Sequence, residues 1–184
     1  MLKPNMTKSD IEKELATKGK YVQIDYLTRF LKEQLGTDIK KFVFLKLAEL
    51  YESTDMLIES AKYYNNASVM SVTFSEKINY FTKEAEMYIK AGDFVKADNA
   101  MKKAMTEAPA LKKQEIYNKI KTFYKNQAQI CEKNMKKGQA TRVYERLIEM
   151  KISDDEKREF TNKLLELYEK LGKIREYSAL KGKA

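Results

Sequence analysis

The stretch AEMYIKAGDFVKADNAMKKAMTEAP, residues 85–109, has the residue order of two helices joined by a tight turn. Gly92 can adopt the left-handed backbone that ends a helix, and Asp93 can accept a backbone N–H at the start of the next one. Small residues recur at helical spacing on both sides of this turn: Ala85, Ala97 and Ala104. Small side chains at this spacing let two helices approach closely. The stretch therefore predicts a helical hairpin.

The order of residues in this hairpin resembles a tetratricopeptide repeat, which is a helix, a turn and a second helix. The matching residues are Phe81, Ala85, Tyr88, Gly92, Asp93, Phe94, Ala97, Met101, Ala104 and Pro109. Two positions depart from the family pattern. Glu84 stands in place of the usual Leu, and Phe81 stands in place of the usual Trp.

The same order of small and aromatic residues recurs along the chain. The positions that mark it are Ala48, Ala85, Ala128 and, by register, Leu165. Their separations are 37, 43 and 37 residues, which exceed the usual repeat of about 34. The longer spacing is similar to the helical-hairpin arrays of soluble membrane-fusion attachment proteins. The resemblance is therefore to the tetratricopeptide-repeat-like superfamily in a degenerate form, and it covers residues 38–181.

The resemblance implies an all-α fold, a right-handed α-solenoid of stacked antiparallel helical hairpins with about ten helices. Helical spacing predicts helices over residues 10–18, 21–35, 38–53, 55–70, 74–91, 94–108, 110–136, 138–151, 155–171 and 173–181. The whole chain, residues 1–184, is then a single repeat domain. Its expected units are an N-terminal cap hairpin at 7–37, followed by 38–72, 73–109, 110–152 and 153–184.

Two kinds of signal mark the helix ends. Ser or Thr followed three residues later by Glu predicts a helix start, because each side chain can satisfy a free backbone N–H. Such pairs are Ser9 with Glu12, Thr73 with Glu76, and Ser153 with Glu156. Glycine is favoured just after a helix. We therefore expect helices to stop at Gly19, Gly36, Gly92, Gly138 and Gly172, with Asp55 in the place of Gly92 one unit earlier.

The composition argues against catalysis. The chain has no histidine, so the commonest general base and the commonest zinc ligand are missing. No Gly-rich phosphate-binding loop and no dinucleotide-binding pattern occurs. The one cysteine, Cys131, falls at a repeat-core position, where we expect a small buried hydrophobe. These features predict a protein that is not an enzyme and that uses no cofactor and no metal.

Length and hydropathy set the broad class. At 184 residues, 43% of them hydrophobic, the chain can bury a core. No apolar run approaches the length of a transmembrane helix, and no secretion signal is visible at the N-terminus. We therefore expect no membrane span and a cytoplasmic location.

The formal net charge of +9 is unevenly distributed. Residues 110–137 contain eight lysines and two glutamates, a balance of +6. Such a segment is either a solvated helix face or a surface for weak, sequence-independent binding of nucleic acid. The lysines expected to form a basic patch are Lys112, Lys119, Lys121, Lys136 and Lys137.

The resemblance also implies where a partner binds, because the first helix of each hairpin lines the concave side of the array. The residues expected to face a partner are Asn79, Thr82, Glu86, Lys90, Lys125, Gln129, Lys133, Asn162 and Glu166. This surface carries both signs of charge, so it predicts a protein or peptide ligand rather than a purely anionic one.

Three functions remain open from the sequence. The leading one is a protein–protein interaction scaffold or adaptor that binds a peptide or a partner subunit in the concave groove. The second is a basic nucleic-acid-associated helical protein that uses residues 110–137. The third is a structural homo-oligomer that associates through the C-terminal hairpin, where Ile174, Tyr177 and Leu180 offer an apolar face.

Overall fold

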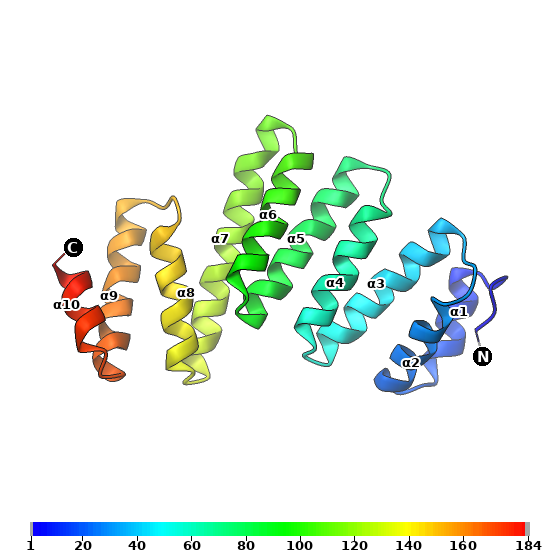
Figure 1. Cartoon of the computed structure of the whole chain (residues 1–184), viewed down its shortest axis with the longest axis horizontal. Coiled ribbons are helices and arrows are strands. Elements are labelled where there is room, and N and C mark those ends of the chain that lie inside the picture. The colour runs from blue at the N-terminus through cyan, green and yellow to red at the C-terminus, as the bar shows by residue number, and fades with distance from the viewer. Residues whose placement is uncertain (1, 183–184) are drawn as a thin grey trace.

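A computed structural model describes residues 2–182 of the chain, and it is all-helical over that range. Figure 1 shows the ten helices following one another in chain order along the long axis. Their bounds are α1 (Lys8–Ala16), α2 (Lys20–Phe30), α3 (Thr37–Ser53), α4 (Leu57–Val69), α5 (Phe74–Ala91), α6 (Phe94–Glu107), α7 (Ala110–Lys133), α8 (Lys137–Glu149), α9 (Asp154–Lys170) and α10 (Ile174–Lys181). In residues 2–182, no helix combines the length and the apolarity that crossing a bilayer requires.

Four of the connections between helices have the same backbone geometry. One residue in each adopts a positive φ: Asp55 (60°), Gly92 (77°), Met135 (58°) and Gly172 (67°). The N–H of the following residue then donates to a carbonyl five positions back. These bonds are Met56 N to Tyr51 O, Asp93 N to Tyr88 O, Lys136 N to Cys131 O, and Lys173 N to Tyr168 O, at 2.8–2.9 Å. This is the Schellman arrangement that satisfies the last carbonyls of a helix.

The four turns have the same spacing as the positions that mark the repeat in the sequence. Each left-handed residue lies seven positions after Ala48, Ala85, Ala128 or Leu165, so the turns repeat at 37, 43 and 37 residues. Each of the units expected at 38–72, 73–109, 110–152 and 153–184 contains one such turn, the last unit being described only to residue 182. The internal repeat is therefore present in the backbone as well as in the sequence.

Three of the five glycines do not end a helix as expected. Gly19 and Gly36 are the residues that precede α2 and α3, so they mark helix starts. Gly138 is the second residue of α8, and the left-handed position of that turn is occupied by Met135 instead. The prediction failed there because glycine is permitted at a left-handed position but the turn does not require it.

Met135 stores a small amount of conformational strain, since a side chain with a Cβ is disfavoured in the left-handed region. Its side chain is exposed, so removing it costs little packing. We expect Met135→Gly to raise the free energy of unfolding by about 0.5–1 kcal/mol. Urea denaturation measures the change. Asp55→Gly is the matched control and should gain less, because Asp tolerates this conformation; a loss of stability in Met135→Gly would contradict the explanation.

The predicted helix starts are confirmed at two of three places. Thr73 accepts a hydrogen bond from Glu76 N, and Ser153 forms a complete capping box with Glu156. The first helix begins differently from the expectation of Ser9 with Glu12. Thr7 is its capping residue, and the Asp10 carboxylate accepts a hydrogen bond from Thr7 N at 3.1 Å. Asp at the third position does the work that the pattern assigns to Glu.

The second helix is shorter than expected: it ends at Phe30, whereas the sequence predicted an end at residue 35. The chain then makes two short turn bonds, Lys32 N to Arg29 O and Glu33 N to Phe30 O. Leu31 and Leu35 still pack on the core after the helix has ended. The apolar spacing therefore continues past the helix, which is why the sequence overestimated its length.

The core consists of two clusters of buried residues. A small one joins α1, α2 and α3 around Ile11, Leu27 and Leu47. A larger one runs from Ala48 to the last hairpin and contains Ala85, Ala97, Tyr124 and Leu164, and Tyr63 packs against both clusters. The core therefore extends along the array. From α2 to α10, each helix contacts the next one in the chain. In addition, α5 contacts α7.

Candidate functional site

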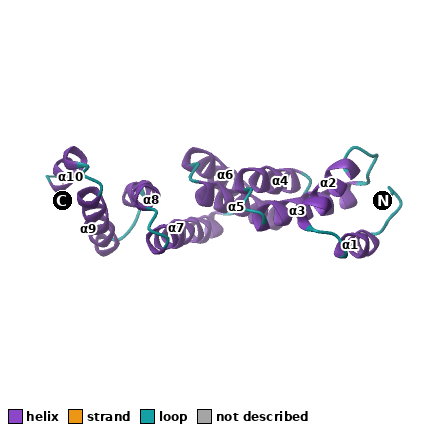
Figure 2. Ribbon diagram, turned by 90° about the horizontal axis from the view of Figure 1, so that it is seen from below, coloured by secondary structure: helices purple, strands orange, loops and turns teal. Residues whose placement is uncertain are grey.

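A groove of about 580 Å³ lies where three of the repeated turns come together. It is lined by Glu52, Asp55, Leu57, Lys90, Ala91, Gln127, Ile130, Cys131, Asn134, Lys136 and Gln139, and we name it the turn groove. These residues belong to the α3–α4, α5–α6 and α7–α8 turns and to the helix ends beside them. Those turns lie along the lower edge in Figure 1, and Figure 2 views the molecule from that edge.

Paired charges fix one wall of the turn groove. Lys90 Nζ donates to Glu52 Oε1 at 2.8 Å and also lies 2.9 Å from Glu86 Oε1. Burial alone would lower the pKa of Lys90, but the two carboxylates outweigh it and raise the pKa. Burial would likewise raise the pKa of Glu86, and the Lys90 and Lys83 ammonium groups lower it instead. Both shifts favour the charged forms of Lys90 and Glu86, so opposite charges bound to each other form this wall.

The rest of the turn groove contains charged side chains that are not in ion pairs. Asp55 and Lys136 are exposed and form no ion pair within residues 2–182. In the same groove the Ile130 side chain is 48% exposed. An acid, a base and an apolar side chain in one groove suit a peptide, which brings backbone amides and mixed side chains.

Cys131 lines the same groove. Its side chain is buried, as the sequence predicts, and burial raises the pKa of its thiol, although Gln127 and the Lys136 charge partly oppose that rise. Its sulfur lies 3.5 Å from Gln127 Nε2 and 3.9 Å from Gln139 Oε1. A reactive thiol has a lowered pKa instead. Within residues 2–182, no group of three or more acidic or thiol side chains is placed to hold a metal ion.

The structure does not gather the predicted concave residues into one surface. Glu86 and Lys90 bind each other, and Lys125 binds Glu156 of α9. Gln129 and Lys133 are exposed on α7, and Asn79 is exposed on α5. Asn162 lines a cleft of about 660 Å³ together with residues of α8 and α10, whereas Glu166 lines a separate cleft of about 300 Å³ beside Lys137 and Lys163.

Thr82 is not at the surface at all, so it is removed from the candidate residues. Its side chain is 2% exposed, and its hydroxyl donates to Ile78 O within the same helix at 2.6 Å. Helical spacing predicted that Thr82 faces a partner, but its side of α5 is buried in the structure. Only Lys90 among the predicted concave residues lines the turn groove.

The expected basic patch is spread out rather than compact. Lys112 and Lys136 sit near opposite ends of α7, which is 24 residues long and therefore about 36 Å. Lys119 is exposed, Lys121 pairs with Glu156, and Lys137 lines the cleft that contains Glu166. The excess positive charge of residues 110–137 is therefore partly neutralised and partly divided between two ends of the molecule.

Lys121 and Lys125 share one carboxylate, and this contact recurs elsewhere in the repeat. Both ammonium groups bind Glu156, the third residue of α9. Two units earlier in the chain, Lys41 of α3 binds Glu76, the third residue of α5, at 3.0 Å. Each glutamate therefore serves at a helix start and also holds a lysine of the preceding unit, 35 residues back in both cases for Lys41 and Lys121. The hydrogen bond from Lys125 is the main reason that the pKa of Glu156 falls to about 2.

The lowered pKa of Glu156 gives a pH dependence with a definite sign. Its stabilising contribution is present above its ordinary pKa of 4.5 and is lost as the pH falls from there towards 2. We expect Glu156→Gln to lower the free energy of unfolding by about 1–2 kcal/mol at neutral pH. The difference from the unmodified protein should shrink steadily below about pH 5 in urea titrations. Glu169→Gln on the same helix is the control, and a pH-independent difference would contradict the assignment.

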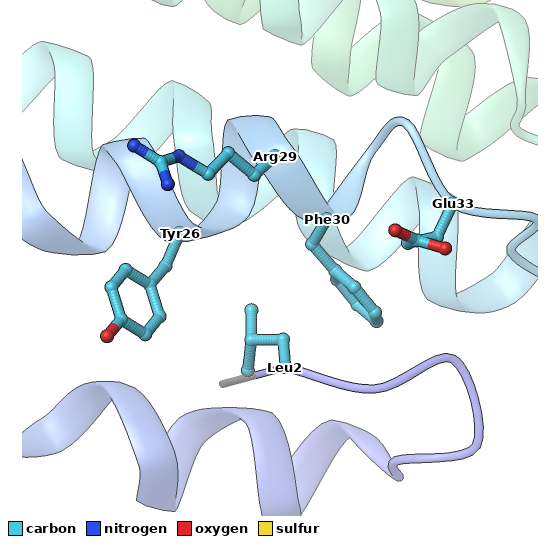
Figure 3. Close-up of a pocket in the computed structure, with 5 residues that line it drawn as sticks. All are labelled: Leu2, Tyr26, Arg29, Phe30 and Glu33. Atoms are coloured by element: carbon cyan, nitrogen blue, oxygen red, sulfur yellow. The ribbon is translucent and has the colours of Figure 1, made fainter.

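A smaller pocket of about 160 Å³ lies at the N-terminal end, and Figure 3 shows the side chains that line it. Leu2 points from the N-terminal segment towards Phe30 of α2, while Tyr26, Arg29 and Glu33 surround the opening. Leu2 is buried and belongs to the N-terminal core cluster. The segment before α1 therefore packs against α2 as part of the fold.

The C-terminal hairpin exposes less apolar surface than its sequence suggests. Tyr177 and Leu180 pack on the main core cluster, which leaves Ile174 as the exposed member of the expected face. This reduces the apolar area that a second copy could cover there.

The sequence analysis gave no partner-binding role to five residues that line the turn groove: Asp55, Gln127, Ile130, Asn134 and Gln139. The missed residues lie within eight positions of the left-handed residues Asp55 and Met135. The repeated turns could have indicated these residues, because they bring the ends of α3, α5 and α7 to one edge. The predicted concave residues lie mostly along the helices and not at these ends.

No family model matches the chain, and no curated protein matches it. Among solved structures, the chain is similar to the crystal structure of BtubC (BKLC) from P. vanneervenii, with 13% sequence identity and a TM-score of 0.41. That alignment covers 94% of this chain and 74% of that chain. A similarity at this level carries no argument about fold or function. The proposals that follow rest on the geometry of the chain itself.

Proposed function

We propose that this protein is an interaction scaffold, a tetratricopeptide-repeat-like right-handed α-solenoid that binds an extended peptide or a partner subunit. The observation that carries the proposal is the turn groove, which extends over three units and contains an unpaired acid, an unpaired base and an exposed apolar residue. Three turns with one backbone geometry support it, because they bring side chains of all three units to the same groove.

The proposed role is not catalytic. The groove holds no histidine, and burial raises the pKa of its one cysteine. Its lysine Lys90 is bound by Glu52 and Glu86, which raises the pKa of that lysine, whereas a general acid or base needs a pKa near the working pH. We propose a cytoplasmic location as part of the same reading.

Nucleic-acid binding and self-association are less well supported. A phosphate-binding surface needs several free cations on one face, and here the lysines of α7 are divided between its two ends and an ion pair with Glu156. Self-association through the last hairpin depends on an apolar face of which Tyr177 and Leu180 are already packed.

The test is a selection of peptides from a random library on the intact protein, followed by affinity measurement with two double variants. Ile130→Ser with Lys136→Ala alters the turn groove, and Leu111→Ser with Lys112→Ala alters the opposite end of the same helix. Loss of the buried apolar contact and of one charge should weaken the selected peptides about tenfold in the first variant and leave them unchanged in the second. Equal affinity in both variants, or a library that yields no binder, would refute the proposal.

A further inference from the structure

A second surface lies at the opposite edge of the molecule and exposes large apolar side chains. Val69, Val72, Phe74 and Leu111 are between 66% and 96% exposed. The first three flank the α4–α5 connection, and Leu111 follows the α6–α7 connection. Both connections lie along the upper edge in Figure 1, away from the turn groove.

These two connections are neighbours through one lysine. The ammonium group of Lys77 lies 5.9 Å from the centre of the Phe74 ring and 3.5 Å from Glu107 Oε2. Glu107 is the last residue of α6, directly before the turn that leads to Leu111. The exposed apolar residues therefore belong to one surface. We name it the loop-tip surface and define it as Val69, Val72, Phe74, Leu111, Lys112 and Lys113.

The free charge of this surface is positive on balance. Glu76 is paired with Lys41, and Glu107 is paired with Lys77. Lys112, Lys113 and Glu115 are exposed and form no ion pair within residues 2–182. Two lysines next to Leu111 therefore outweigh one glutamate a helical turn further along α7.

We propose that the loop-tip surface docks the protein onto an anionic lipid membrane. The apolar side chains protrude from loop ends and do not line a groove, so they suit insertion among lipid headgroups better than the binding of a helix or strand. Lysines beside them are attracted to anionic headgroups, each contributing to binding near the surface. A second copy of the chain fits poorly, because its own Lys112 and Lys113 would meet like charges.

The experiment is sedimentation of the full chain with vesicles of phosphatidylcholine alone and with about 30% phosphatidylserine. We expect binding to the anionic vesicles, weakened when sodium chloride rises from about 0.1 M to about 0.5 M. Val72→Ser with Leu111→Ser should reduce the partition coefficient about tenfold, because two inserted side chains are lost. Lys112→Ala with Lys113→Ala should reduce it roughly tenfold on anionic vesicles.

Val95→Ser with Met135→Ser is the matched control, since both residues are comparably exposed but lie at the lower edge. It should bind vesicles as the unmodified chain does. No binding to anionic vesicles, or equal binding by the loop-tip and control variants, would overturn the proposal. So would a fall in solution mass of the loop-tip variant, which would assign the surface to a second copy. Because the loop-tip surface is distant from the turn groove, neither outcome depends on peptide binding.

Discussion

Lys103→Met should destabilise the protein by about 3 kcal/mol, because it leaves the Glu84 carboxylate buried without its partner. Glu84 is 4% exposed, and Lys103 Nζ donates to both of its oxygens, at 3.0 and 3.2 Å. The same ammonium group donates to Asn65 Oδ1 at 2.8 Å, so one lysine of α6 joins α4 and α5. Burial raises the pKa of Glu84, and the bond from Lys103 opposes that rise.

The deficit of this variant should shrink as the pH falls, as it does for Glu156→Gln, but in a window above the ordinary glutamate pKa of 4.5 and for the opposite reason, because the pKa of Glu84 is raised whereas that of Glu156 is lowered. A carboxyl group whose pKa is raised in the folded state destabilises that state above the raised pKa, and protonation relieves the cost. The deficit of Lys103→Met relative to the unmodified protein should therefore shrink as the pH falls through the raised pKa of Glu84 towards 4.5.

A double variant separates the loss of a partner from the loss of packing. Glu84→Leu combined with Lys103→Met removes both charges and places an apolar side chain at the buried position 84. We expect it to recover most of the lost stability, since well-packed apolar residues replace a buried pair at little cost. The midpoint and slope of urea unfolding give the free energy of unfolding of the unmodified protein, the single variant and the double variant. If the double variant is as unstable as Lys103→Met, the deficit arises from the Asn65 contact or from the lysine stem.

Ala85→Leu should cost roughly 2–3 kcal/mol, because the residue is fully buried where α5 meets its neighbours and the added side chain has no space. Ala97→Leu on α6 should behave similarly, since Ala97 is also buried in the same cluster. Asn99→Leu is the control on α6. That position is exposed, so the change should stay within about 0.5 kcal/mol. Neutral midpoints for both alanine variants would show that the two positions have free volume beside them.

The fourth unit gives a natural comparison for this prediction. Leu165 occupies the position that Ala48, Ala85 and Ala128 hold in the other units. All three alanines are buried, whereas Leu165 is only half-buried. A large side chain therefore stands where the position is partly open to solvent, and the small residues stand where it is closed.

Much of the fold could be predicted because the repeat is recorded in residues with strict steric requirements. Ala48, Ala85 and Ala128 are buried, and the left-handed residue of the same unit follows each of them by seven positions. Ten helices were expected and ten lie within residues 2–182. The failures occur where several residue types satisfy the same geometry. Met135 in a left-handed turn and Asp10 in a capping box are two examples.

The site was much harder to predict, because it depends on contacts between residues far apart in the chain. Helical spacing places Thr82 on one face of α5, but it does not say which neighbouring helix covers that face. The pairing of Lys121 and Lys125 with Glu156 likewise depends on how α9 lies against α7. A clue was present, since the other predicted capping glutamate, Glu76, has a lysine at the same interval. Variants that reverse the charge of Lys121 or Lys125 would therefore change stability as well as binding.

The double use of Glu76 and Glu156 bears on how the chain opens. Each carboxylate helps to start its own helix and also ties that helix to a lysine one unit earlier. When the first turn of α9 frays, Lys121 and Lys125 lose their partner in the same event, so opening cannot stay confined to one hairpin. Backbone amides at the start of α9 and around Lys121 should then exchange with solvent as one cooperative unit, with a shared opening free energy.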